Sequence, residues 1–361
     1  MRIAVDASIL ELPCPTGVER AAFELVSALP ATLGPRDELI VLARGVPALR
    51  LPESPRVRVV GLGGREPLAV WRETRLAAAL PSQAADVLWS PVAALPYRAE
   101  IPRVATVHEL PWRVRAGMEG RLREHVHRVR VRLAAQCARL VVVPSEFTAA
   151  QLRDEVPDAA GRVRVVPHGV APRFLAPVDA AAAARLRRHH AVPDAPYLLH
   201  VGGTRPRKAV PLLLRAYARY RLQGGTRALV LAGPGDAPER PPAGVVHLGW
   251  VADDLLLALY DGAAALVVAS ESEGFGLPCL EAGARGVPVV ARSTGALPEV
   301  LGDAGLLVDG ADEELAAALV RLDRERGLAE RLVDRGRARA AARTIEAAAR
   351  RLRAVLDEAV T

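Results

Sequence analysis

The chain has 361 residues, of which 51% are hydrophobic and 25% charged, a balance that excludes a mainly disordered protein and suits two domains of ordinary size. Its net charge is +7, but 47 of its 48 basic residues are arginine and aromatic residues make up only 4%. This uniform preference for arginine, with few rings to stack on bases, argues against a nucleic-acid-binding protein.

Several features predict a cytoplasmic protein. No charge-free stretch approaches the ~18 residues that span a bilayer, and Asp6 interrupts the apolar start of the chain, where a signal peptide would continue. The cysteines, Cys14, Cys137 and Cys279, are far apart and lack CxxC spacing. This spacing argues against a disulfide framework and against a zinc site.

Short apolar, β-branched runs alternate with longer segments rich in Ala, Leu and Arg, the pattern of parallel sheets covered by helices. In the first half, apolar residues recur with a period near 3.6 at 18–29 and 120–138, which predicts helices there. Strands are expected at 2–6, 39–43, 57–60, 86–89, 104–108, 140–143 and 163–166.

The pattern restarts after residues 171–196, a proline-containing segment that predicts a linker with one short helix. Strands are then expected at 197–201, 228–232, 245–248, 265–269, 287–291 and 306–308. Residues 312–360 are expected to be almost wholly helical. Two consecutive α/β domains follow, and in such sheets ligands bind beyond the carboxyl ends of the strands. The cleft between the domains is the expected site.

The segment 270–300 is the most informative about chemistry. The strand expected at 265–269 leads into a loop, Glu273–Gly276, and Pro278 then opens a short helix. Glycines let the backbone approach a ligand, and the amides of a helix N-terminus favour anionic or oxygen-rich groups. Glu273 and Glu281 can face one ligand, and a carboxylate can accept two hydroxyls of a ribose or sugar ring. An ordinary strand–loop–helix with a solvated and a capping glutamate is the alternative.

The sequence EGFGLPCLE at 273–281 resembles the E-x7-E motif of retaining glycosyltransferases of family 4, which have the GT-B fold. The resemblance spans nearly the whole chain, with further blocks in the expected order: TGVER, TVHEL, VPSEFTAAQL, VVPHGV, VGGTRPRKAV, LVLAGPG, LGWVADDLLLALYDGAAALVVASESEGFGLP, GVPVVARSTGALPEV and GDAGLLVD. It implies two Rossmann-like, doubly wound domains facing across a cleft. Residues 1–172 would bind the acceptor, 173–343 the nucleotide sugar, and 344–361 would form a helix that crosses back to the first domain.

The resemblance also implies residue roles. Glu281 would hold the ribose hydroxyls, and Glu273 would lie near the reacting carbon of the donor sugar. Catalytic roles are implied for His108, Glu273, Arg207 and Lys208. Donor binding is implied for Gly17, Arg207, Lys208, Glu273, Gly274, Phe275, Gly276, Leu277 and Glu281.

The residue types suit these roles. Arg207 and Lys208 follow a strand and can neutralise a diphosphate, and Lys208 is the one lysine of the chain. His108 matches the family's histidine beside the donor sugar, although a histidine at a strand end is often structural. Gly17 opens the first helix and would bring its backbone close to the diphosphate. Two departures from the family pattern are Glu109, where aspartate is commoner, and Ala209, where asparagine is commoner.

The expected reaction transfers a hexose from a nucleotide diphosphate sugar to an acceptor hydroxyl with retention, in glycan, glycolipid or glycoside synthesis. No cofactor and no metal are expected, since Arg207, Lys208 and helix amides would replace the cation. The blocks look most like those of bacterial mannosyltransferases, which favours GDP-mannose over UDP-sugars. The alternatives are a sugar-nucleotide epimerase or a phosphorylase of the same fold, and an inactive sugar-nucleotide-binding regulator. Cys279 is expected to be a small core residue.

One further segment has an unusual charge. Residues 113–139 contain eight arginines against Glu119 and Glu124, while Val126, Val129, Leu133 and Cys137 recur at helical spacing. A solvated helix is the simpler interpretation. The alternative is a peripheral contact with anionic lipid or a phosphate-bearing lipid acceptor at the inner face of the membrane.

Overall fold

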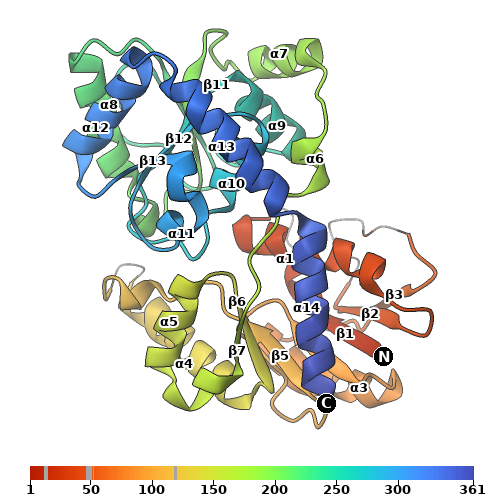
Figure 1. Cartoon of the computed structure of the whole chain (residues 1–361). Coiled ribbons are helices and arrows are strands. Elements are labelled where there is room, and N and C mark those ends of the chain that lie inside the picture. The colour runs from red at the N-terminus through yellow and green to blue at the C-terminus, as the bar shows by residue number, and fades with distance from the viewer. Residues whose placement is uncertain (12–14, 46–50, 52, 118–119) are drawn as a thin grey trace. The chain divides into compact units, whose positions relative to one another are not determined.

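The computed structural model describes residues 1–11, 15–45, 51, 53–117 and 120–361 and divides into two compact units (Figure 1). Unit 1 comprises Met1–Gly169 and Ile345–Thr361, and unit 2 comprises Val170–Thr344. The boundaries expected after residues 172 and 343 are therefore shifted by a few residues. The reason is local, because the Val170 N–H donates to the Arg343 carbonyl (2.8 Å) and Val170 pairs with Thr344.

Unit 1 is built on a parallel sheet, seven-stranded within the described residues, with strand order β3-β2-β1-β4-β5-β6-β7. Its strands are β1 (Arg2–Asp6), β2 (Glu38–Ala43), β3 (Val57–Gly61), β4 (Val87–Ser90), β5 (Arg103–Thr106), β6 (Leu140–Val143) and β7 (Val163–Val165). Its α-helices are α1 (Gly17–Ala28), α2 (Leu68–Trp71), α3 (Ala77–Ser82), α4 (Arg121–Cys137), α5 (Glu146–Glu155) and α14 (Ile345–Val360). Short turns of 3₁₀-helix lie at Ser8–Glu11, Leu29–Thr32, Pro111–Arg113 and Pro157–Arg162, and a π-helical turn lies at Arg72–Leu76.

Helices cover both faces of this sheet because successive side chains of a strand point to opposite faces. In β1, Ile3 and Val5 pack in the core formed with α1 and α14, whereas Ala4 packs in the core formed with α2 and α3. The last helix, α14, contacts α1 and the strands β4 to β6, so the end of the chain completes the core of the first unit (Figure 1).

Unit 2 repeats the plan with a six-stranded parallel sheet in the order β10-β9-β8-β11-β12-β13. Its strands are β8 (Tyr197–Val201), β9 (Leu229–Ala232), β10 (Val245–His247), β11 (Ala263–Val268), β12 (Val289–Arg292) and β13 (Gly305–Val308). Its helices are α6 (Pro172–Leu175), α7 (Ala180–His189), α8 (Val210–Leu222), α9 (Asp253–Gly262), α10 (Leu277–Ala284), α11 (Leu297–Leu301), α12 (Asp312–Arg324) and α13 (Leu328–Ala342), with 3₁₀ turns at Pro206–Lys208 and Gly302–Ala304.

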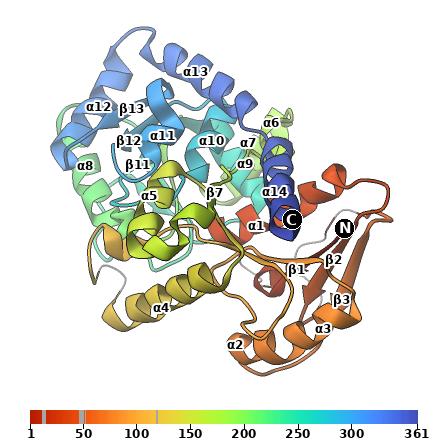
Figure 2. The same cartoon turned by 60° about the horizontal axis from the view of Figure 1, so that its bottom comes forward.

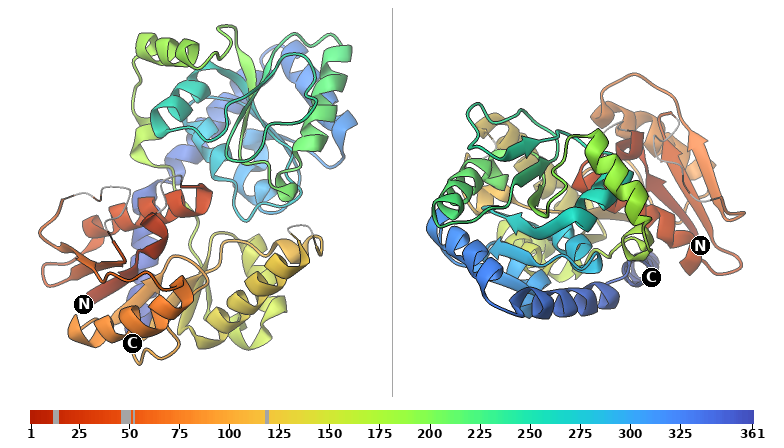
Figure 3. Two further views of the ribbon diagram at one scale, coloured as in Figure 1. Left: turned by 180° about the vertical axis from the view of Figure 1, so that it is seen from behind. Right: turned by 90° about the horizontal axis from the view of Figure 1, so that it is seen from above.

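Helices again pack on the sheet in two groups. Figure 2 shows α12 and α13 lying along one side of unit 2, where their leucines share a core with α8. Helix α7 lies beside α9, as Figure 3 shows from behind, and α9 contacts β8 and β11. The expected linker at 171–196 is thus part of this unit and holds α6 and α7.

In both sheets the strand order reverses direction beside the first strand of the unit, between β1 and β4 and between β8 and β11. This is the order of the doubly wound Rossmann fold, whose ligands bind at that point, outside the carboxyl ends of the strands. The loops that follow β8 and β11 contain Lys208 and Glu273 respectively. The topology therefore brings two of the predicted site residues to the expected edge of unit 2.

Strand positions predicted from sequence agree with the structure to within a few residues, whereas helices at 68–82 and 146–155 were not predicted. The 68–82 segment consists of two short α-helices joined by a π-helical turn, and it contains Pro81. It therefore has no clear 3.6-residue apolar period. The sequence signal for helix α5 is Ser145, a residue type that caps helices. In the structure it forms the N-cap and accepts a hydrogen bond from the Thr148 N–H (3.1 Å).

No helix in the described part of the chain combines the length and the apolar character that a membrane span requires.

Candidate functional site

A buried carboxylate and two cations meet at the carboxyl edge of the unit 2 sheet. The Lys208 ammonium lies 2.6 Å from Glu273 Oε1, and the Arg207 guanidinium lies 3.7 Å from Glu273 Oε2. The three side chains are only 13%, 12% and 8% exposed, for Lys208, Arg207 and Glu273 respectively. The structure thus brings together the three unit 2 residues for which catalytic roles were predicted.

The two loops that supply these residues are fastened to each other. The Ser270 hydroxyl donates to Glu273 Oε1 (2.6 Å), and the Glu271 N–H donates to the Arg207 carbonyl (2.8 Å). Ser270 is not among the site residues predicted from the sequence. Its place three residues before Glu273, in a tight loop, is the signal that could have indicated it, because serine hydroxyls bond locally in such turns.

The cations determine the charge state of Glu273. Burial acts to raise its pKa, but the charges of Lys208 and Arg207, with the hydrogen bonds from Lys208 and Ser270, outweigh burial and lower the pKa below its ordinary value. Glu273 is therefore ionised near neutral pH, and its negative charge balances a pair of cations that would otherwise repel each other.

Two glycines allow the loop to pack this closely. Gly276 has φ +93°, and a Cβ there would lie 2.6 Å from Leu297 Cδ2. Gly295 has φ +61°, and a Cβ there would lie 2.5 Å from the Glu273 carbonyl oxygen, which accepts a hydrogen bond from the Ala296 N–H (2.9 Å). Both positions need the left-handed backbone that glycine adopts at little cost. Glu273 is consequently held by its backbone as well as by its side chain.

Helix α10 begins at Leu277, directly after this loop, and contains Glu281, which is 8% exposed. The Tyr260 hydroxyl of α9 donates to Glu281 Oε2 (2.8 Å). Phe275 is also buried, so it can offer a ligand its backbone more readily than its ring. Cys279 is 2% exposed, and burial raises the pKa of its thiol, which agrees with a small core residue and not with a nucleophile.

A further buried histidine at this edge was not found from the sequence. His200 of β8 is 1% exposed, and its Nδ1–H donates to the Val267 carbonyl (3.1 Å). Burial lowers its pKa to about 4, and the nearby Lys208 charge acts in the same direction. His200 is therefore neutral near pH 7 and adds no third positive charge beside Arg207 and Lys208.

In unit 1, His108 lies two residues beyond the end of β5 at Thr106, so it follows the strand that was expected to end at His108 itself. Its Nε2–H donates to the Pro91 carbonyl (2.8 Å), and its ring stacks on His168, with centroids 5.5 Å apart and planes 25° apart. Burial lowers the pKa of both rings, that of His168 to about 3. Both imidazoles are neutral near pH 7. The sequence block VVPHGV contained His168, but no sequence pattern indicated that it contacts His108.

Gly17 is the first residue of α1, as predicted. Thr16 forms the N-cap, and its backbone N–H donates to Glu19 Oε2 (2.8 Å). A Cβ on Gly17 would meet no atom of the described residues within 4 Å. Packing within the protein therefore does not require glycine here, whereas the close approach of a ligand to the helix N-terminus would.

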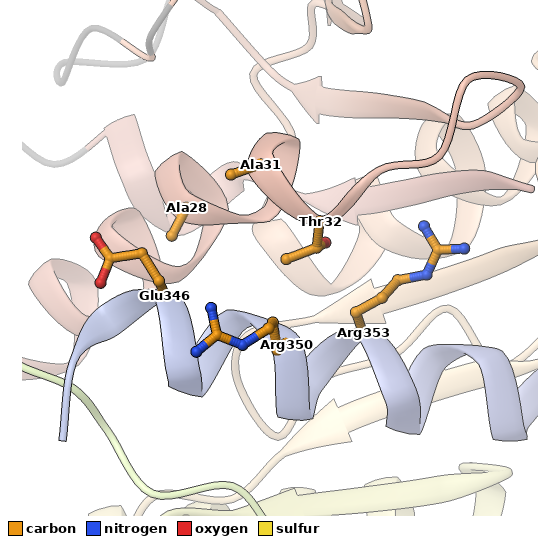
Figure 4. A pocket seen from close by; sticks show the side chains of 6 residues that line it. All are labelled: Ala28, Ala31, Thr32, Glu346, Arg350 and Arg353. Carbon is orange, nitrogen blue, oxygen red and sulfur yellow. The ribbon is translucent and has the colours of Figure 1, made fainter. Parts of the chain in front are cut away.

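Two further observations concern metal binding and cavities within the described residues. No group of three or more His, Cys, Asp or Glu side chains in the described ranges is arranged to hold a metal ion. A pocket of about 280 Å³ lies in unit 1 and is lined by Ala28, Ala31, Thr32, Glu346, Arg350 and Arg353 (Figure 4). It adjoins the C-terminal end of α1, about 16 Å along the helix from Gly17, so it is separate from the predicted donor-binding position at Gly17. Cys14 and Glu119 lie outside the described residues.

Comparisons with known structures identify the class of fold. Sucrose-phosphate synthase of Thermosynechococcus elongatus is 23% identical, covers 99% of this chain and 98% of its own, and has a TM-score of 0.79. HepE of Anabaena, solved in complex with UDP-glucose, is 19% identical, covers 99% of both chains and has a TM-score of 0.72. The protein therefore has the two-domain α/β fold called GT-B.

Sequence profiles and curated relatives identify the family. The profile described as Glycosyltransferase Family 4 matches residues 15–174, and that described as Glycosyl transferases group 1 matches residues 195–325. D-inositol 3-phosphate glycosyltransferase of Acidothermus cellulolyticus is 35% identical over 247 residues, which are 62% of this chain and 54% of the relative. O-antigen chain mannosyltransferase B of Escherichia coli is 39% identical over 133 residues, 34% of this chain and 35% of the relative. The matched parts thus span about half of these relatives' length or less. The chain belongs to glycosyltransferase family 4.

Proposed function

We propose that the protein transfers a hexose from a nucleotide diphosphate sugar to a hydroxyl of an acceptor, with retention of configuration. The observation that carries the proposal is the cluster of Lys208, Arg207 and Glu273 at the carboxyl edge of the unit 2 sheet. Glu281 lies in helix α10, which begins directly after the Glu273 loop. Two cations suit the diphosphate, and two carboxylates suit the sugar and ribose hydroxyls.

The cations would act on the departing diphosphate. As the bond between the sugar carbon and the diphosphate oxygen breaks, negative charge develops on that oxygen. Groups already fixed where this charge develops stabilise the transition state without reorganising. Because Lys208 and Arg207 are largely buried and fastened by Glu273, they meet this condition. They can supply the charge that a metal ion supplies in other transferases, so we propose a metal-independent reaction that needs no cofactor.

Glu273 would position the sugar and not attack it. Its Oε1 already accepts hydrogen bonds from Lys208 and Ser270, and its Oε2 faces Arg207. A carboxylate whose charge is neutralised in this way is a weak nucleophile. We therefore propose a reaction on one face of the sugar, in which the acceptor oxygen forms its bond as the diphosphate leaves and passes its proton to a phosphate oxygen. His108 would lie beside the donor sugar, and its neutral state allows it to bond to a hydroxyl.

GDP-mannose is the favoured donor, since one relative is by name a mannosyltransferase, whereas the HepE structure contains UDP-glucose. A thermal-shift screen of GDP-, UDP-, ADP- and dTDP-sugars tests this choice. A donor at 100 times its dissociation constant stabilises the folded state by about 2.7 kcal/mol, so the correct one should stand out. Stabilisation by none of them would contradict the proposal.

Product analysis separates transfer from the alternatives. With the donor found in the screen, a transferase releases the nucleoside diphosphate, by slow hydrolysis or by transfer to an added acceptor. An epimerase would instead return a changed nucleotide sugar, and an inactive regulator would bind without turnover. Activity should persist in excess EDTA. A requirement for added Mg²⁺ or Mn²⁺ would contradict the metal-independent reaction.

We further propose that α4 contacts an anionic membrane surface. Its side chains Leu122, Val126, Val129 and Leu133 are 78%, 41%, 41% and 40% exposed. At 100° per residue they fall within an arc of roughly 60°. The buried residue Val131 lies on the opposite side of the helix. Of the apolar residues that recur at helical spacing, Val126, Val129 and Leu133 thus face outward in one stripe with Leu122, whereas Cys137 is half-buried.

Basic side chains flank this stripe. Arg121 lies on one side of it, and Arg123 and Arg130 lie on the other, all three exposed. By contrast, Arg128 and Arg132 each bond to Glu155 (2.7 Å), so two of the arginines fasten α4 to α5. An exposed apolar stripe between arginines is the pattern of a helix lying in a membrane interface. Each exposed cation near an anionic surface contributes about 1 kcal/mol.

Co-sedimentation with vesicles of phosphatidylcholine, alone or mixed with phosphatidylglycerol, at low and high salt tests this contact. The wild type should sediment with the anionic vesicles at low salt. The double variant Leu122→Glu and Val126→Glu should stay in the supernatant. Leu222→Glu is the matched control, because Leu222 is 89% exposed but lies at the end of α8 in unit 2. Equal recovery of the wild type in the supernatant under all conditions would reject the contact.

A further inference from the structure

The hydrogen bond between Tyr260 and Glu281 has no role in the chemistry proposed so far. It joins the end of α9 to α10 (Figure 2), and both residues are buried, at 0% and 8% exposure. The Tyr260 hydroxyl lies 2.8 Å from Glu281 Oε2 and 3.4 Å from the Pro278 carbonyl. A hydroxyl has one proton to donate, and the carboxylate oxygen at 2.8 Å is a much nearer acceptor than the carbonyl oxygen at 3.4 Å. The phenol proton is therefore directed at Glu281.

Packing fixes the position of the phenol. The ring of Phe174, from α6, meets the Tyr260 ring edge-on, with centroids 6.0 Å apart and planes 79° apart. The preceding residue of α9, Leu259, has its carbonyl bonded by the Tyr197 hydroxyl of β8 (2.7 Å). Groups from α6 and β8 thus hold this end of α9 in place. The phenol is a rigid donor that does not depend on a ligand for its orientation.

A rigid donor matters because the last torsion of a glutamate side chain is only weakly restricted. A carboxylate that accepts two vicinal hydroxyls must be rotated so that both of its oxygens face those hydroxyls. Holding one oxygen beforehand removes the cost of ordering the group when the ligand binds. A carboxylate has about four acceptor positions, and the phenol occupies one of them on Oε2.

Resting on the proposed function, in which Glu281 accepts the ribose diol of the donor, we propose that Tyr260 is a positioning residue that orients the Glu281 carboxylate toward that diol. Tyr260 thereby sets the preference of the site for ribonucleotides over nucleotides that lack the diol. Tyr260 acts through Glu281 and does not itself touch the nucleotide.

The substitution Tyr260→Phe isolates this role, since it keeps the ring that packs against Phe174 and removes only the hydroxyl. The probes are GDP and UDP, each beside its 2′,3′-dideoxy counterpart, and the measurement is the dissociation constant from calorimetry. Tyr260→Phe should weaken binding of the preferred ribonucleotide about tenfold and leave binding of its dideoxy form unchanged. Tyr197→Phe is the matched control. It removes an equally buried phenol hydroxyl that bonds to a backbone carbonyl of the same helix, and it should leave the preference unchanged.

A second measurement asks whether Tyr260 acts through Glu281. In a Glu281→Gln background, Tyr260→Phe should cause no further loss of ribonucleotide preference. If Tyr260→Phe weakens the ribo and dideoxy forms equally, or weakens neither, the proposal is wrong while nucleotide binding stands. A wild type that binds the two forms equally contradicts the assignment of Glu281 to the ribose and the proposal with it. A wild type that binds none of the four nucleotides contradicts the proposed function itself.

Discussion

Replacing Lys208 with alanine should lower turnover more than donor affinity. Lys208 lies 2.6 Å from Glu273 and is 13% exposed, so water screens its charge only weakly. In the proposed reaction this charge acts on the diphosphate as it departs. Removing one fixed group that stabilises developing charge costs about 10²- to 10³-fold in kcat, or about 2.7–4 kcal/mol. Donor binding should suffer less, because in the proposed complex Arg207 and the loop amides would still face the ground-state diphosphate.

The same change should destabilise the fold moderately. Removing one partner of a buried ion pair costs about 3–5 kcal/mol when the other charge is left without compensation. Here Glu273 keeps the Ser270 hydroxyl (2.6 Å) and the Arg207 guanidinium (3.7 Å). We therefore expect a loss of about 1–3 kcal/mol in the free energy of unfolding. Thermal unfolding of the variant establishes that it is folded at the assay temperature.

The pH dependence gives an independent check. The pKa of Glu273 is lowered in the folded protein, so its ionised form contributes stability above its unfolded pKa. That contribution is lost as the pH falls through the folded pKa. Without Lys208 the folded pKa rises, because burial is then opposed mainly by Arg207. The acid limb of the unfolding free energy should accordingly move to higher pH in Lys208→Ala than in the wild type.

The assay is steady-state kinetics of nucleoside diphosphate release over a range of donor concentrations. Lys208→Arg is the control that retains the positive charge, and it should recover part of kcat. If Lys208→Ala raises KM and leaves kcat unchanged, the charge acts on donor binding alone and the reasoning is refuted.

Three further predictions follow from single contacts. Glu281→Ala should weaken nucleotide binding by about 1.5–3 kcal/mol, as expected for hydrogen bonds to a charged acceptor, and unchanged affinity in calorimetry would contradict its assignment. His200, with its pKa lowered to about 4, should make the unfolding free energy about 2 kcal/mol smaller at pH 5 than at pH 7, because the unfolded state takes up the proton first. His200→Gln should reduce this difference between the unfolding free energies at pH 5 and pH 7, as measured by denaturant titrations. The same substitution at the exposed His189 should not. Ala209 precedes α8 with φ +50° and forms no side-chain cap. Because asparagine tolerates the left-handed backbone and caps helices, Ala209→Asn should stabilise the protein by about 1 kcal/mol. A lower melting temperature would argue against backbone strain at this position.

The amino-acid sequence by itself determined the α/β class and the position of nearly every strand. The reason is that strands buried on both faces must be continuous apolar runs, which stand out between helical segments. It also identified Glu273, Glu281, Arg207 and Lys208 as candidates. Glu273 and the Arg207–Lys208 pair follow strands β11 and β8, and parallel strands that lie side by side present the segments after them at one edge of the sheet.

The local sequence pattern left other features undecided. The apolar residues of α4 have the same spacing whether they face the core or the solvent, because periodicity specifies a stripe and not its orientation. In the structure Val131 packs inward, and Arg128 and Arg132 bond to Glu155. These contacts fix the rotation of α4 so that the apolar stripe that contains Val126 faces outward.

Contacts between residues distant in the sequence were decided by the tertiary structure alone. Tyr260 meets Glu281, His108 stacks on His168, and His200 takes its neutral form, only because separate strands and helices bring them together and exclude water. Burial and neighbouring charge determine the protonation state of such groups, and neither is a property of the residue's place in the chain. The sequence therefore names the chemical groups of the site, whereas the tertiary structure decides which of them are charged and which are held in position.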